Sequence, residues 1–197
     1  MSTRKKIFCI KRRVKMIYES KEIALKDGRH ALLRAPSEAD SAEMVEYMKK
    51  TAAETEFLSR YPDEVMQTAE SEREYLRSSL ASEKSMMMVC EVGGEMAGNC
   101  QFVLGRHEKM RHRATVMIAL LRKFWGLGIG GIMFAELEAE AKKHGASQLE
   151  LTVVEGNERA IALYRKMGFD VVGRMPRGFV FRDGTTHDEI YMVKIIG

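Results

Sequence analysis

The middle of the chain places four glycines between a strand-like run and the start of a helix. The stretch RKFWGLGIGG spans residues 122–131 and contains the only tryptophan, Trp125. The apolar run ATVMIALL precedes it, and the segment IMFAELEAEAKKHG that follows has the spacing of an amphipathic helix. Glycine in a helix costs about 1 kcal/mol per position relative to alanine. We therefore expect a bound ligand to offset this cost.

A buried strand that leads into a glycine-rich turn and a helix is typical of an anion site. Main-chain N–H groups converge there, the helix dipole favours negative charge, and missing side chains let a phosphate approach. Two common phosphate loops fit poorly. A P-loop requires Gly-Lys-Ser/Thr after its second glycine, where this chain has Gly130-Gly131-Ile132. A dinucleotide fingerprint requires G-x-G-x-x-G in an early βαβ unit, but this stretch lies past the middle of the chain.

Length and composition fit one globular domain. The chain has 197 residues, of which 45% are hydrophobic and 30% are charged. No apolar run approaches the roughly 18 residues of a membrane span, and the N-terminal IFCI is too short for a signal peptide, so we expect a cytoplasmic protein. Cys9, Cys90 and Cys100 lack the spacing of metal ligands, and we interpret them as buried or idle thiols in a reducing compartment. No metal site is predicted.

Positive charge is concentrated at the N-terminus. Residues 1–15 contain seven lysines and arginines and no acidic residue, so the net charge of +4 leaves the rest of the chain at −3. We divide the chain into a basic arm at 1–17 and a single domain at 18–197. The arm is interpreted as a disordered leader in preference to a nucleic-acid contact.

Hydrophobic periodicity predicts the order β-α-α-β-β-β-α-β-α-β-β, without repeat or linker, which is a mixed α/β domain. The first extended segment is a hairpin around Asp27-Gly28. Helices are expected at about 39–50, 68–82, 129–144 and 158–167, the second capped by Thr68 and the last by Asn157. The final two strands are expected at 169–175 and 188–196, with a long connection between them.

The glycine stretch resembles motif A of the GNAT superfamily of acyl-CoA-dependent N-acyltransferases, whose pattern is Arg/Gln-x-x-Gly-x-Gly/Ala. Gly128 and Gly130 match the two glycines, and Trp125 stands where arginine or glutamine is usual. Independently, LTVVEGNERAIALYRKMGF at 151–169 resembles motif B of the same family. The resemblance covers the chain from about residue 22 to its end. It implies the GNAT fold, a mixed, mostly antiparallel sheet of six to seven strands flanked by about four helices.

The resemblance implies acetyl-CoA as co-substrate. The pyrophosphate is expected on the amides at the helix start near Gly128, and the pantetheine arm is expected to pair with the strand before it. The residues that the resemblance assigns to cofactor binding are Ala119, Leu120, Leu121, Trp125, Gly126, Leu127, Gly128, Ile129, Gly130, Gly131, Asn157, Ala160 and Tyr164.

The resemblance also implies direct acyl transfer from a thioester to an amine. Tyr164 matches the motif B tyrosine and is predicted to protonate the leaving thiolate. It also lies on an apolar stripe, so core packing is the alternative. A main-chain N–H near Leu120 or Leu121 is expected to stabilise the developing oxyanion. For the general base, Glu150 is the nearest candidate, and a water chain is the alternative.

The acceptor is the least determined part of the prediction. Glu54, Glu56 and Tyr61 are predicted to bind a positively charged small amine. The chain is therefore predicted to acetylate a primary amine of a small molecule, such as a polyamine or an amino acid. The alternatives are an acetyltransferase for protein N-termini of the ribosomal type and a non-catalytic acyl-CoA-binding module. Neither a nucleic acid nor a membrane is a predicted partner, and a homodimer stays open.

Overall fold

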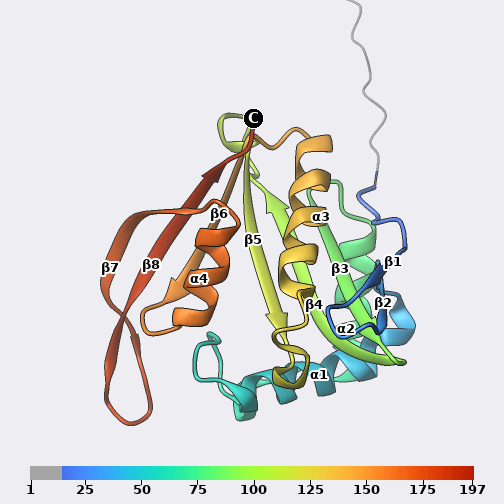
Figure 1. Ribbon diagram of the computed structural model, residues 1–197, viewed down its shortest axis with the longest axis horizontal. Helices are drawn as coiled ribbons and strands as arrows, with labels where there is room; N and C mark the ends of the chain where they lie inside the picture. The colour runs from blue at the N-terminus through green and yellow to red at the C-terminus, as the bar shows by residue number, and fades with distance from the viewer. Residues whose placement is uncertain (1–14) are drawn as a thin grey trace, which may run out of the picture.

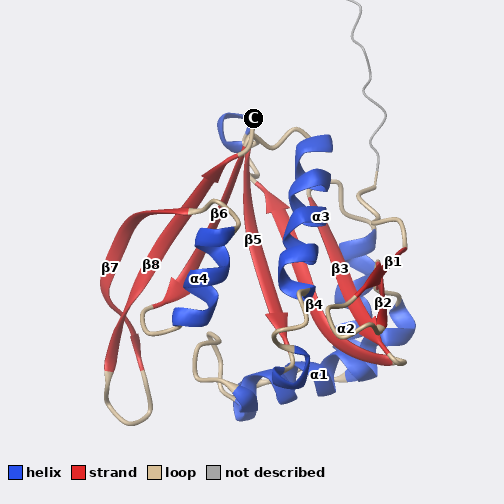
Figure 2. Ribbon diagram, viewed as in Figure 1, coloured by secondary structure: helices blue, strands red, loops and turns tan. Residues whose placement is uncertain are grey.

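A computed structural model describes residues 15–197, so Cys9 and most of the predicted basic arm lie outside the described residues. Figure 2 shows the alternation of helices and strands. The strands are β1 (Lys21–Ala24), β2 (His30–Arg34), β3 (Ser85–Val92), β4 (Glu95–Leu104), β5 (Arg113–Leu120), β6 (Gln148–Val154), β7 (Asp170–Val180) and β8 (Thr186–Ile195). The helices are α1 (Ser41–Glu54), α2 (Ala69–Leu80), α3 (Ile129–Lys143) and α4 (Glu158–Lys166), with short 3₁₀ turns between some elements.

All eight strands form one sheet in the order β1-β2-β3-β4-β5-β6-β8-β7. Only β5 and β6 are parallel, and every other neighbouring pair is antiparallel. The predicted mixed, mostly antiparallel sheet is confirmed, with slightly more strands than expected. The extra strand comes from the first hairpin, because its four-residue arm β1 pairs along its full length with β2.

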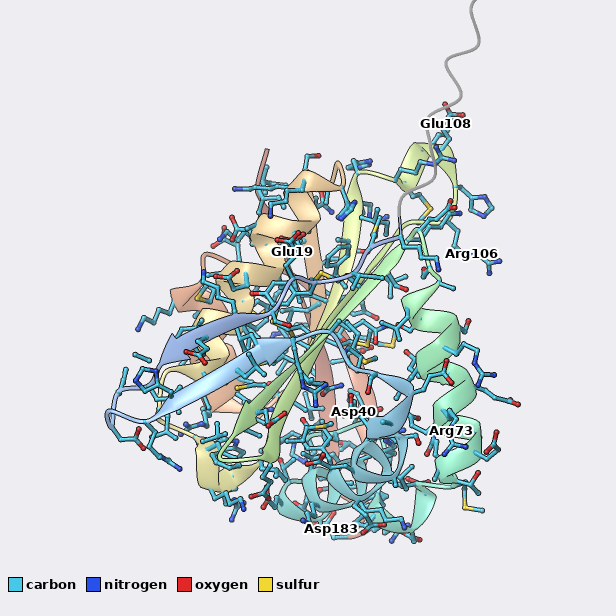
Figure 3. All side chains as sticks on the ribbon, turned by 90° about the vertical axis from the view of Figure 1, so that its right-hand side faces the viewer. Glu19, Asp40, Arg73, Arg106, Glu108 and Asp183 are labelled. Atoms are coloured by element: carbon cyan, nitrogen blue, oxygen red, sulfur yellow. The ribbon has the colours of Figure 1, made fainter. Side chains whose placement is uncertain are left out.

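Helices cover both faces of the sheet. In Figure 1, α3 and α4 lie in front of the sheet, while α2 lies behind it. Figure 3 gives the side view, in which Arg73 marks α2 on the opposite side from α3. The core between these layers is apolar, and its largest fully buried side chains include Phe102, Phe134 and Phe169. No helix among residues 15–197 is long and apolar enough to cross a membrane.

Local signals set the starts of α2 and α4 as predicted, whereas α1 begins after a 3₁₀ turn at Glu38–Asp40 and continues to Glu54, past the expected end near residue 50. The Thr68 hydroxyl accepts a hydrogen bond from the Ser71 N–H at the start of α2. The Asn157 side chain accepts one from the Ala160 N–H at the start of α4. Side-chain oxygens of this kind satisfy N–H groups that have no partner within the helix. Cys90 and Cys100 are buried and free, as predicted, and burial raises the pKa of the Cys90 thiol to about 11.

The last hairpin is longer than predicted. The expected strand at 169–175 continues as β7 to Val180, so the connection between β7 and β8 contains only residues 181–185. Pro176 lies inside the observed strand, although proline cannot donate to a strand ladder. Here β7 is an edge strand with β8 as its sole partner, and the pairing shifts register between Met175 and Phe179. An edge strand tolerates proline at such an irregularity.

Candidate active site

The two parallel strands separate along their length. β5 and β6 pair through three rungs, the last of which joins Thr115 to Glu150. Beyond it β5 continues to Leu120 and β6 to Val154 without pairing, and the strands diverge (Figure 1). Side chains of both strands line a cleft of about 1850 Å³. Typical small-molecule pockets hold about 300–1,000 Å³, so this cleft has room for a large co-substrate together with an acceptor.

The main chain of β5 has a free edge toward this gap. Leu121 N–H donates to the Ala97 carbonyl at 2.9 Å, and the Arg113 carbonyl accepts from Gly105 N–H at 3.0 Å, so odd-numbered residues face β4. Main-chain groups of successive strand residues point to opposite edges. The main-chain N–H and carbonyl groups of the even-numbered residues Ile118 and Leu120 therefore point into the gap between β5 and β6. Of the two donors expected for the oxyanion, Leu121 is already bonded, which leaves the Leu120 N–H.

The free edge of β5 leads to a row of free amides. Among the described residues, no acceptor receives a hydrogen bond from the main-chain N–H groups of residues 126–131, and the first α3 bond runs from Ile132 N–H to the Gly128 carbonyl. Gly128 caps α3 with φ of 91°, a left-handed conformation that side chains rarely adopt. A Cβ placed on Gly131 would meet no protein atom within 4 Å. Amides and space together suit a phosphate group.

Gly130 has a different role in the same stretch. A Cβ at this position would lie 3.1 Å from Leu163 Cδ2 and 3.3 Å from Leu120 Cδ1. These separations are tighter than ordinary van der Waals contact. The absence of a side chain therefore lets the start of α3 pack against the end of β5 and against α4, and packing explains part of the glycine content.

Trp125 connects the glycine stretch to β5. Its indole N–H donates to the Leu120 carbonyl at 2.8 Å. The guanidinium groups of Arg159 and Arg122 lie 4.7 Å and 5.5 Å from the ring centroid, within cation–π range. The tryptophan thus fixes the loop to the strand end and holds two positive charges beside the free amides.

Tyr164 packs in the core and also borders the cleft. Its ring packs in the core at 5.5 Å from Phe134 and 6.1 Å from Phe169 between centroids. The side chain also lines the cleft, and its hydroxyl has no hydrogen-bond partner within residues 15–197. Burial raises the pKa of Tyr164 to about 12. The phenol therefore carries its proton at neutral pH and is free to donate it.

Glu150 lies where the strands begin to separate. Its Oε2 forms an ion pair with Arg113 Nη2 at 2.6 Å, and its Oε1 accepts a hydrogen bond from the Thr115 hydroxyl at 3.2 Å. All three residues line the cleft, as does Thr152 on the same face of β6. The two partners hold the carboxylate in a fixed orientation in the lining of the cleft.

The structure does not bring the three predicted acceptor residues together. Glu54 lines the cleft, but its Oε2 accepts from the Arg122 N–H at 2.5 Å. Glu56 is exposed and is not among the residues that line the cleft. The Tyr61 hydroxyl accepts from the Arg182 N–H at 2.8 Å, and the Arg182 guanidinium covers the Tyr61 ring at 3.9 Å. Tyr61 therefore ties the β7–β8 connection to the loop after α1.

Sequence reasoning missed three cleft residues on the opposite wall, namely Tyr47 on α1, Gln67 before α2 and Glu72 on α2. Helical spacing after Met44 could have placed Tyr47 on the buried face of α1. No sequence signal separates Glu72 from the other charged residues of its helix.

Among the described residues, no group of three or more His, Cys, Asp or Glu side chains is arranged to hold a metal ion.

Tyr47 bridges two strands next to the free edge of β5. Its hydroxyl donates to the Ala119 carbonyl at 2.7 Å and accepts from the Asn99 N–H at 3.2 Å. The side chain is 3% exposed. A buried tyrosine that satisfies a carbonyl and an amide in neighbouring strands fixes the position of β5 one residue before Leu120.

Tyr47→Phe is expected to lower the free energy of unfolding by about 1–3 kcal/mol, because two main-chain groups lose their buried partner. Urea denaturation measures this change. Tyr75→Phe is the matched control, since the Tyr75 hydroxyl bonds Gln101 at an exposed position, and it is expected to cost less than about 0.5 kcal/mol. Equal effects of the two substitutions would show that the Tyr47 bridge does not stabilise the strands.

Comparisons with known proteins agree with this geometry. A family model described as the acetyltransferase (GNAT) family matches residues 46–169, more than half of the chain. An acetyltransferase of Pectobacterium atrosepticum is 27% identical over 97 residues, which cover 49% of this chain and 66% of that protein. The chain thus spans just under two thirds of the length of this curated relative.

Two solved structures resemble the whole domain. The acetyltransferase of the GNAT family from Streptococcus pneumoniae is 27% identical with a TM-score of 0.79, and the match covers 85% of this chain and 99% of that one. YncA from Salmonella typhimurium, solved with its cofactor acetyl-CoA, is 20% identical with a TM-score of 0.74, covering 85% and 94%. At 20% identity, the similarity to YncA shows that the two chains share a fold.

Proposed function

The chain belongs to the acetyltransferase (GNAT) family, and we propose that it transfers an acetyl group from acetyl-CoA to a primary amine of a small molecule. One observation carries the proposal. The free main-chain edge of β5 leads directly to the free amides at 126–131, in a cleft that Tyr164 also lines. This arrangement offers a place for an extended thioester arm with a phosphate group at its end.

The binding roles follow from the free groups. The amides of 126–131, at the positive end of the α3 dipole, suit the pyrophosphate, and Arg122 and Arg159 add positive charge beside them. The main-chain N–H and carbonyl of Ile118 suit the amides of the pantetheine arm, because an extended chain can pair with an open strand edge. The Leu120 carbonyl already accepts from the Trp125 indole, so of Leu120 only the N–H is free. Lys26 lies next to Gly128 and reaches the same region from the first hairpin.

The catalytic roles follow from position and protonation. The Leu120 N–H stabilises negative charge that develops on the thioester oxygen when the amine attacks its carbonyl carbon. Tyr164 donates its proton to the sulfur as the carbon–sulfur bond breaks. Glu150, held by Arg113 and Thr115, takes the proton that the attacking amine loses, directly or through water. The acceptor enters from the α1–α2 side, where Glu54 adds negative charge and Tyr61 fixes the neighbouring loop.

Thiol release from acetyl-CoA tests the proposal. The protein is assayed with polyamines, amino acids, aminoglycosides and short peptides with free N-termini. We expect release that depends on at least one small amine and exceeds release with any peptide. Release with peptides alone would instead establish a protein N-terminal acetyltransferase. If the protein binds acetyl-CoA but releases no thiol with any member of the panel, transfer to a small amine is contradicted.

A further inference from the structure

The α2 wall of the cleft contains a buried carboxylate that has no partner. Glu72 is 5% exposed and lines the cleft, yet it forms no hydrogen bond or ion pair with any residue in the described part of the chain. Its neighbours on α2 behave differently, because Glu70 pairs with Arg73 at 2.6 Å and Glu74 is exposed. Removing a carboxylate from water without a partner is costly, and burial raises the pKa of Glu72 above its usual range.

A second acceptor without a partner lies on the same wall. The Oε1 atom of Gln67 is fully buried and has no hydrogen-bond partner, the one side-chain atom of this kind in the described structure. Gln67 also lines the cleft. Buried amide oxygens are almost always hydrogen-bonded in folded proteins, and this one has no donor among the described residues.

The positive charge nearby does not satisfy either group. Arg60 is the cation that acts on Glu72, and it lowers the pKa of the carboxyl from a distance without forming an ion pair. Its Nη2 instead donates to the Met48 sulfur at 3.1 Å. Tyr75, also on α2 and in the cleft lining, donates to Gln101. Two acceptor groups, five residues apart in the chain, thus line the cleft without a donor among the described residues.

We propose that Glu72 and Gln67 bind a cationic nitrogen of the acceptor, an ammonium or guanidinium group separate from the amine that is acetylated. An ammonium has three donors, enough to bond the carboxylate and the amide oxygen together and to neutralise the buried charge. The acceptor class is then a molecule with two basic nitrogens. This inference rests on the proposed function, since it places the second nitrogen in the cleft where transfer occurs.

Matched amines test the proposal. Thiol release from acetyl-CoA is measured with 1,3-diaminopropane, 1,4-diaminobutane and 1,5-diaminopentane, each against the monoamine of equal chain length. We expect kcat/KM to be at least about 10-fold higher for one or more diamines, and Glu72→Gln to lower the diamine value by about 10-fold more than the monoamine value. Glu74→Gln on the exposed face of α2 is the control and should keep the preference. Equal diamine-to-monoamine ratios in the wild type and Glu72→Gln would overturn the proposal.

A binding readout separates this inference from the proposed function. Calorimetric titration of the diamines into the protein saturated with CoA should show affinity that falls about 10-fold or more in Glu72→Gln and several-fold in Gln67→Leu. CoA affinity itself should be equal in all variants, which also verifies folding. Glu72-dependent diamine binding without thiol release would retain the site and reject the reaction. Thiol release without Glu72-dependent binding would retain the reaction and reject the site.

Discussion

Gly128→Val is expected to lose acetyl-CoA affinity by at least about 100-fold. Gly128 holds φ of 91° at the N-cap of α3, and a valine there would be strained by about 1–3 kcal/mol. Its branched side chain would also enter the space beside the free amides of 126–131, next to the Lys26 side chain that lies 3.5 Å from a Cβ at this position. Isothermal calorimetry with acetyl-CoA measures the loss.

Gly145→Val separates lost binding from lost stability. Gly145 follows the other end of α3 with φ of 87°, and a Cβ there would meet no atom within 4 Å. Both valines should therefore lower the free energy of unfolding by a similar amount, about 1–3 kcal/mol in urea. Only Gly128→Val should lose the co-substrate. Unaltered affinity in Gly128→Val, or equal loss in both variants, would show that the amides of 126–131 do not bind the phosphates.

Tyr164→Phe is expected to lower kcat by about 100-fold, the lower end of the range for general acid catalysis. The KM for acetyl-CoA should change little, because the ring stays packed against Phe134 and Phe169. Stability should also change little, since the hydroxyl has no partner among the described residues and its removal leaves no group unsatisfied. Steady-state kinetics with the best amine from the acceptor panel gives both constants. An unchanged kcat would remove Tyr164 from the chemistry.

The pH dependence gives a second test of the same residue. Because burial raises the pKa of Tyr164 to about 12, its proton is present throughout the range in which the enzyme is assayed. The ratio of wild-type to Tyr164→Phe rates should therefore stay constant from about pH 6 to about pH 10, and should fall only as the pH nears 12 and the wild-type phenol loses its proton. A ratio that falls near neutral pH would indicate another acid.

The glycine stretch was predictable because backbone conformation and close packing both favour glycine in the same short segment. Positive φ at Gly126 and Gly128 and a close approach at Gly130 each favour glycine, and these positions fall close together in the sequence. The caps Thr68 and Asn157 were predictable for the same reason, since their side chains bond amides only three residues ahead. Such short-range chemistry can be read from one sequence.

The acceptor side was not predictable, because its properties come from packing between distant segments. The Glu54 carboxylate bonds the Arg122 amide, 68 residues away, and Tyr61 meets Arg182, 121 residues away. Glu72 resembles Glu70 and Glu74 in sequence, and only the packing of α2 on the sheet makes it the buried member. The length of β7 was missed similarly, since the edge position that tolerates Pro176 is a property of the sheet.

The most direct test of the account is a titration of ¹⁵N-labelled protein with CoA, followed through the main-chain amide signals. We expect the largest shifts at Ile118, Leu120 and residues 126–131, the free amides at the edge of β5 and the start of α3. Amides of β7 and β8 should shift little. Large shifts confined to β7, β8 or the β1–β2 hairpin, or no shifts at saturating CoA, would contradict the assignment of the cleft.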